Sequence, residues 1–114
     1  MAFPGTYNFN YYRGDTFQFI VRPKDAAGDQ FDLTGYSSIF TIANQRGTGA
    51  TQYAATSVVN SADDIVTCTI SASTGRNLIP TTSWVYDVQI TNGANIFTLL
   101  TGTITSTDDI TGAV

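Results

Sequence analysis

The side chains that most often carry catalysis are scarce in this chain of 114 residues. It contains nine acidic residues, all Asp, no His, and a single cysteine, Cys68. Without His, the chain has no Ser-His-Asp or Cys-His arrangement, and a zinc site would depend on carboxylates alone. Most of the aspartates fall at predicted turns or strand ends, where Asp bonds the local backbone. The sequence therefore predicts a protein that is not an enzyme and that holds no cofactor or metal.

Two kinds of short motif in the sequence could in principle bind a ligand. Asp63-Asp64 and Asp108-Asp109 offer adjacent carboxylates to Ca²⁺, but the regular spacing of an EF-hand loop is absent and solvated turns explain both pairs. Arg13-Gly14-Asp15 spells an integrin-type tripeptide. It precedes a predicted strand, so Gly and Asp also serve a chain reversal there. Neither motif is assigned a binding function.

Aromatic side chains gather at the N-terminus. The group comprises Phe3, Tyr7, Phe9, Tyr11 and Tyr12. Alternation places Tyr7, Phe9 and Tyr11 on one face of a first strand, whereas Phe3 and Tyr12 lie off that face. One sheet face cannot bury all five, and Tyr and Phe are enriched at interface cores. We expect these five residues to form an assembly interface on a neighbouring subunit; the alternative is an ordinary first strand.

Two other residues have a structural and a functional interpretation. Trp84, the single Trp, falls at an inward position of a predicted strand, which favours core packing over a sugar-stacking platform. Cys68 has no partner for an intrachain disulfide, and we expect it to be a small buried hydrophobe.

Charge limits the classes of partner. The net charge is −4, and the only bases are the scattered residues Arg13, Arg22, Lys24, Arg46 and Arg76. So few bases offer little to a phosphate backbone, and we expect no nucleic-acid partner. The first residues lack the basic segment and apolar run of a signal peptide. No stretch approaches the length of a membrane span, so we expect no membrane partner and assembly in the host cytoplasm.

The elements that must position these residues are predicted to be strands. Thr, Ile, Val, Phe and Tyr dominate, while Glu is absent and Lys occurs once, which favours strand over helix. Two-residue alternation recurs along the chain. Strands are predicted over residues 7–12, 17–22, 36–43, 52–59, 65–71, 83–91 and 95–105, with a short extended piece at 31–33. The strand at 52–59 has a mixed pattern and is predicted to be a weak edge strand.

Turns and domain limits follow from the breaks in this alternation. Residues 71–80 are predicted to hold one short helical turn before Pro80. Asn92-Gly93 predicts a tight hairpin turn. We expect an all-β, Ig-like sandwich of about seven to eight antiparallel strands at residues 13–107. An N-terminal aromatic strand or arm at 1–12 precedes it, and a polar tail at 108–114 follows it.

The order of four segments resembles a known family. The segments are Gly14-Asp15-Thr16 leading into Phe17, Phe19 and Val21; Lys24 to Gly28 followed by Phe31 to Gly35; Trp84 to Ile90; and Leu99 to Ile104. Together they resemble small β-sandwich proteins of tailed phages related to the N-terminal domain of baseplate upper proteins. The resemblance covers about residues 13–107. It implies a virion part that anchors other tail or receptor-binding proteins.

The sequence therefore predicts a non-enzymatic phage virion structural protein that docks on other virion proteins. It would be a tail or baseplate component or a capsid decoration, and multimeric in the particle. Because no extension follows the sandwich, we expect a stand-alone docking module rather than an adaptor. The alternative is a carbohydrate-binding module for host attachment, motivated by Trp84 and the Tyr-rich surface.

Overall fold

The computed structural model describes residues 4–47, 49–108 and 110, and these form an all-β fold with one short helix. The elements are β1 (Gly5–Thr6), β2 (Phe9–Tyr12), β3 (Phe17–Val21), β4 (Ser37–Ala43), β5 (Gln52–Asn60), β6 (Ile65–Ile70), α1 (Ala72–Gly75), β7 (Trp84–Asn92) and β8 (Asn95–Thr107). The predicted all-β class is confirmed. The extended piece expected at 31–33 forms no named strand.

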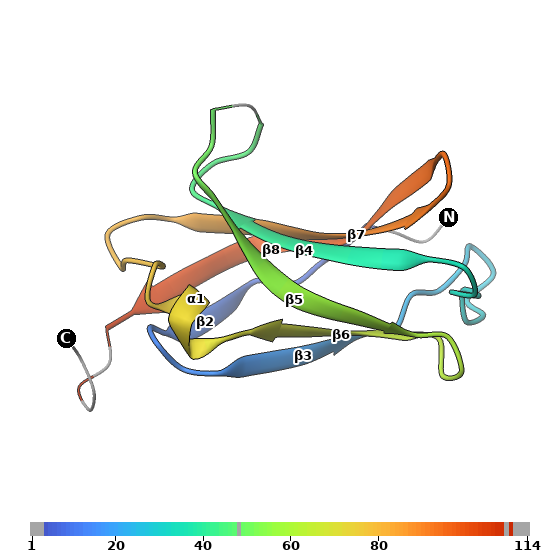
Figure 1. The fold of residues 1–114 in the computed structure, drawn as a ribbon, viewed down its shortest axis with the longest axis horizontal. Helices are drawn as coiled ribbons and strands as arrows, with labels where there is room; N and C mark the ends of the chain where they lie inside the picture. Colours follow the sequence, from blue (N-terminus) through green and yellow to red (C-terminus); the bar gives the residue numbers. More distant parts are fainter. Residues whose placement is uncertain (1–3, 48, 109, 111–114) are drawn as a thin grey trace.

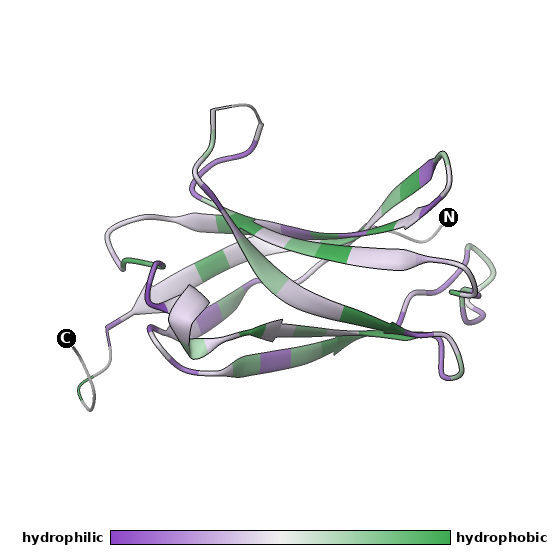
Figure 2. Cartoon of the chain, in the orientation of Figure 1, coloured by the Kyte–Doolittle hydropathy of each residue, from purple (hydrophilic) through white to green (hydrophobic). Residues whose placement is uncertain are grey.

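Alternation of side chains decides which face of each strand is buried. In β7, Trp84, Tyr86, Val88 and Ile90 are buried while the residues between them are half-buried. In β6, Val66, Cys68 and Ile70 are buried in the same way. Figure 2 shows the resulting bands of hydrophobic and hydrophilic residues along the strands. Trp84, which was expected at an inward position, and Cys68, which was expected to be buried, both lie on these buried faces.

The strands form one curled sheet in the order β1-β8-β7-β4-β5-β6-β3, and β2 also pairs with β8. The sheet folds into two layers, with β8, β7 and β4 in one and β6 and β3 in the other (Figure 1). Strand β5 passes between them: its first half pairs with β4 and its second half with β6. The strand predicted at 52–59 as a weak edge strand does not stand at an end of the strand order. Each of its halves nevertheless pairs on one side only, and so is edge-like within its own layer.

The N-terminal strands pair in a direction that the sequence did not predict. Both β1 and β2 run parallel to β8, with Gly5 opposite Leu100 and Phe9 opposite Ile104. The expectation of antiparallel strands throughout is therefore wrong at this edge, and the sheet is mixed. The physical reason is that alternation specifies which face of a strand is buried but not its neighbour or direction.

The two predicted turns are confirmed. Residues Ala72–Gly75 form α1, whose first turn is capped by the Ser71 hydroxyl, which accepts a hydrogen bond from Thr74 N at 3.2 Å. The β7–β8 hairpin reverses at Asn92-Gly93, and Gly93 has the positive φ of 59° that this turn favours.

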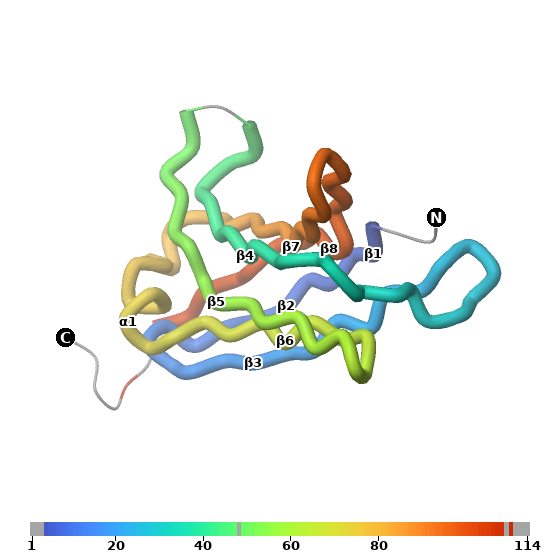
Figure 3. Tube along the Cα trace, turned by 45° about the vertical axis from the view of Figure 1, so that its right-hand side comes forward, coloured from blue at the N-terminus to red at the C-terminus, as the bar shows by residue number. Residues whose placement is uncertain are grey.

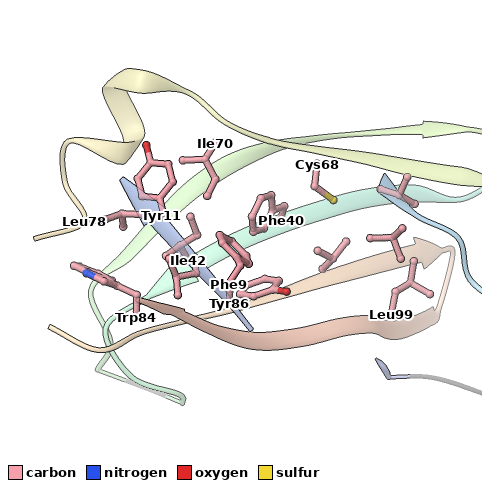
Figure 4. Packing of buried hydrophobic residues seen from close by; sticks show 14 of the residues in the cluster. Phe9, Tyr11, Phe40, Ile42, Cys68, Ile70, Leu78, Trp84, Tyr86 and Leu99 are labelled. Carbon is pink, nitrogen blue, oxygen red and sulfur yellow. The ribbon is translucent and has the colours of Figure 1, made fainter. Parts of the chain in front are cut away.

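The core fills the space between the two layers and joins all the longer strands (Figure 4). Figure 4 shows Leu78 and Trp84 at one end of this core and Leu99 at the other. Cys68 is fully buried, as expected, and burial raises the pKa of its thiol to about 12. Trp84 is also buried, and its Nε1 donates to Ile79 O at 3.0 Å.

Candidate docking groove between two sheet edges

The five N-terminal aromatic residues do not share one environment. Phe9 and Tyr11 are buried in the core cluster, with 8% and 2% of their surface exposed. Tyr7 and Tyr12 remain exposed, at 41% and 58%. Phe3 lies outside the described residues. Of the described aromatic residues predicted to form an assembly interface, Tyr7 and Tyr12 are therefore the ones whose rings reach the surface.

The backbone around Tyr7 is seated tightly on β8 and β7. Tyr7 N donates to Thr101 O at 3.0 Å, and Tyr7 O accepts a hydrogen bond from Tyr86 Oη at 2.6 Å. Gly102 lies directly below, where a side chain would collide with Tyr7 O. This contact needs the missing Cβ of Gly102, and it fixes the path of the N-terminal segment along the edge of the sheet.

Two edges of the curled sheet face each other near Tyr7. The strand order begins at β1 and ends at β3, so each has a side with no strand paired to it among the described elements. A tight turn joins β2 to β3, with Asp15 N donating to Tyr12 O at 3.0 Å. Beyond this turn the two edges are joined through side chains, as in the stacking of Phe9 on Phe17 at 4.6 Å between ring centroids.

A groove of about 540 Å³ opens between these edges, at the end farther from the turn. Gly5, Tyr7, Leu99 and Leu100 line one side, and residues 19–24 line the other. The Phe19 ring lies 5.7 Å from that of Tyr7 and 5.6 Å from that of Phe40, so aromatic packing supports the groove from below. The groove lies at the base of the loop that follows β3, which extends at the right of Figure 3.

A β-bulge shapes the β8 side of the groove. The β7–β8 register shifts between Val88 and Gln89, whose partners are Leu100 and Thr98, and Leu99 is the extra residue. Bulges redirect side chains next to functional surfaces. Here the bulge buries Leu99 and leaves Leu100 half-buried, so both contribute to the groove.

Basic residues stand at one end of the groove. Arg22 and Lys24 are both exposed and line it. Within residues 4–47, 49–108 and 110, Arg13 and Asp108 form an ion pair at 3.3 Å, and neither Arg22 nor Lys24 belongs to one. The nearby Asp25 carboxylate accepts hydrogen bonds from Ala27 N and Asp29 N and so is held in its own turn.

A second, polar hollow of about 250 Å³ lies on the outer face of β4 and β7. It is lined by Arg46, Asp87, Gln52 and Gln89 among others. Burial raises the pKa of Asp87, and the Arg46 guanidinium opposes this shift. The hollow therefore combines a carboxyl group, a guanidinium and amides.

The other motifs serve the fold in the described residues. Asp64 Oδ1 accepts a hydrogen bond from Leu33 N at 3.1 Å, and Asp63 Oδ2 accepts one from Asn60 Nδ2 at 3.1 Å. Arg13 Nε donates to Arg76 O at 2.8 Å, so this arginine of the tripeptide holds the chain. Asp109 lies outside the described residues. In the part of the chain that is described, no three Cys or Asp side chains are placed to share a metal ion.

Sequence reasoning missed most of this groove. The lining residues that were not predicted include Phe19, Ile20, Arg22, Lys24, Leu99 and Leu100. Two signals were present: Ile20 is an apolar residue at an outward position of its strand, and adjacent Leu99 and Leu100 interrupt the alternation of theirs. No local signal indicated that residues 5–7 and 19–24 lie across from each other.

The chain matches no protein-family model and no curated protein sequence. No helix in the described residues has the length and apolar character needed to cross a membrane.

Proposed function

We propose that this chain is a non-enzymatic structural protein of a phage virion that docks on neighbouring virion proteins. It would be a tail or baseplate component or a capsid decoration, present in several copies and assembled in the host cytoplasm. The proposal includes an Ig-like arrangement of the sandwich and neither nucleic acid nor membrane as a partner. The four sequence segments that resemble phage baseplate proteins motivate it.

The observation that carries the docking function is the groove between two sheet edges. Its walls combine an exposed aromatic ring, Tyr7, with the apolar residues Ile20 and Leu100. Exposed apolar surface of this kind marks interaction sites on soluble proteins.

Repetition on a particle would strengthen docking. If each copy binds its neighbour weakly, simultaneous contacts raise the overall affinity by effective concentration. The domain itself can then remain small. Weak, repeated contacts of this kind fit a groove in which Tyr7 and Ile20 are the exposed large hydrophobic residues.

Mass spectrometry of purified particles tests the proposal. Particles of the phage whose genome carries this coding sequence should contain the chain at a fixed ratio to the major capsid protein. An abundant cytoplasmic host protein, quantified in the same digest, controls for carry-over. Finding the chain only at the level of that host protein would contradict the virion assignment.

The second candidate function is carbohydrate binding in host attachment. Buried Trp84 is not available as a stacking platform, but the polar hollow at Arg46 and Asp87 presents groups that bond sugar hydroxyls. Glycan-array binding that is lost in Asp87→Asn would favour this candidate, and an array with no bound glycan would remove it.

A further inference from the structure

We propose that the groove binds an extended peptide segment of a neighbouring protein, which adds to the free edge of β3 and places acidic side chains beside Arg22 and Lys24. The inference rests on the proposed docking function and specifies its partner. It requires an open strand edge, an apolar floor and basic residues at one end of the groove.

The edge of β3 offers main-chain bonding to a partner. All five residues of β3 pair with β6 on one side, and β3 is the last strand in the sheet order. Alternate residues of an edge strand direct N–H and C=O groups away from the sheet. An added strand would pair with the part of β3 that lines the groove, from Phe19 onward, because Phe9 stacks on Phe17 nearer the turn.

The floor of the groove selects apolar side chains. Phe19 faces the core side of β3, where its ring contacts those of Tyr7 and Phe40. Leu99 and Leu100 stand opposite, on β8. A strand added at β3 would turn every second side chain toward this floor, so apolar residues are expected at alternate positions of the peptide.

The basic residues of the groove indicate that one end of the bound peptide is acidic. The chain as a whole carries a net charge of −4 and would repel an acidic partner. The groove is an exception, because Arg22 and Lys24 are two of the five basic residues. Carboxylates at one end of the peptide would meet both, and this complementarity favours an acidic over a basic segment.

Peptide selection tests the inference on the full chain. A displayed library of random nine-residue peptides is selected against the immobilised protein, and enriched peptides are synthesised with a fluorescent label. We expect sequences that alternate apolar residues and end in Asp or Glu. Failure to enrich any peptide would overturn the inference.

Two exposed apolar residues provide a matched pair of variants for locating the bound peptide. Ile20 lines the groove and Val58 does not, yet both are exposed and both pair with Thr67 in the same layer. Ile20→Glu should weaken binding of the selected peptide by about tenfold or more, because it places a negative charge against the apolar and acidic groups of the peptide. Val58→Glu should change binding by less than about twofold. Equal binding to both variants would place the peptide elsewhere.

The basic end is tested by a cycle of charge changes. Arg22→Gln combined with Lys24→Gln should weaken binding of the acidic peptide by about twofold to thirtyfold, the range for two exposed ion pairs. The same peptide with its acids replaced by Ser should bind the wild type and the double variant alike. An acidic peptide that is insensitive to the double variant would contradict the assigned polarity.

Backbone methylation distinguishes strand addition from side-chain docking. In an added strand, alternate N–H groups face the edge. N-methylation of one alternate set of peptide amides should abolish binding, whereas methylation of the other set should be tolerated. Tolerance of both sets would overturn strand addition.

The two proposals fail separately. Particles that contain the chain although no peptide is selected would remove this inference and leave the proposed virion role. A selected peptide together with particles that lack the chain would remove the virion role alone.

Discussion

At the scale of the residue, the close packing of the Tyr7 backbone on β8 depends on the absence of a side chain at Gly102. Tyr7 O occupies the space that a side chain would need, and it accepts a hydrogen bond from Tyr86 Oη at 2.6 Å. Burial raises the pKa of this phenol, so Tyr86 keeps its proton and remains a donor. One glycine and one tyrosine thus hold the N-terminal segment in place beside the groove.

A single methyl group tests this packing. Gly102→Ala should destabilise the fold by about 1–3 kcal/mol, because the added carbon displaces Tyr7 from β8. Gly5→Ala is the matched control: its added carbon would lie 3.6 Å from Leu100 Cδ1, an ordinary contact. Urea unfolding followed by Trp84 fluorescence measures both. Equal stability of the two variants would show that Tyr7 moves without cost.

At the scale of the element, β5 joins the two layers of the curled sheet. Gln52 to Ala55 pair with β4, and Thr56 to Asn60 pair with β6. Its inward residues Tyr53, Ala55 and Val59 pack against the core, whereas Val58 is exposed. The face on which a β5 residue lies therefore decides its burial, although the residue types along the strand do not alternate regularly.

Adjacent valines in β5 provide a test of this register. Val59→Thr should cost about 1–3 kcal/mol, because it places a hydroxyl against the core. Val58→Thr makes the same chemical change on the exposed face and should alter the free energy of unfolding by less than about 0.5 kcal/mol. Both values come from chemical denaturation. A reversed order would mean that β5 is shifted by one residue.

At the scale of the whole molecule, the N-terminal segment belongs to the body of the domain. Phe9 and Tyr11 are part of the core, and the chain from Tyr7 to Arg13 bonds to β8. Among the described aromatic residues of this segment, Tyr7 and Tyr12 are the exposed ones.

Deletion of residues 1–12 should abolish cooperative folding. Loss of a buried Phe alone costs about 3–5 kcal/mol, and total stabilities are about 5–15 kcal/mol. The deletion removes Phe9, Tyr11 and the parallel partner of β8 together. Circular dichroism and thermal melting of the truncated chain are the measurements. A truncated chain that melts cooperatively would instead identify the segment as a detachable arm.

Much of the fold could be predicted from the sequence by itself, because strand faces and turns are set by neighbouring residues. The alternation around Trp84 to Ile90 predicted the buried face of β7, and Asn92-Gly93 predicted its hairpin. Cys68 and Trp84 were expected in the core and lie there. Composition also predicted the all-β class without reference to any relative.

The tertiary structure alone decided which strands pair and what lies between the edges. Alternation is the same for parallel and antiparallel neighbours, so it could not reveal that β1 and β2 run parallel to β8. Nor could it reveal that β5 is paired in both layers. The groove brings Tyr7 opposite Phe19 and Arg22 only because β1 and β3 end the same curled sheet. Pairing between distant segments is set by the fold of the whole chain, whereas the burial of a strand face is set by the alternation of neighbouring residues.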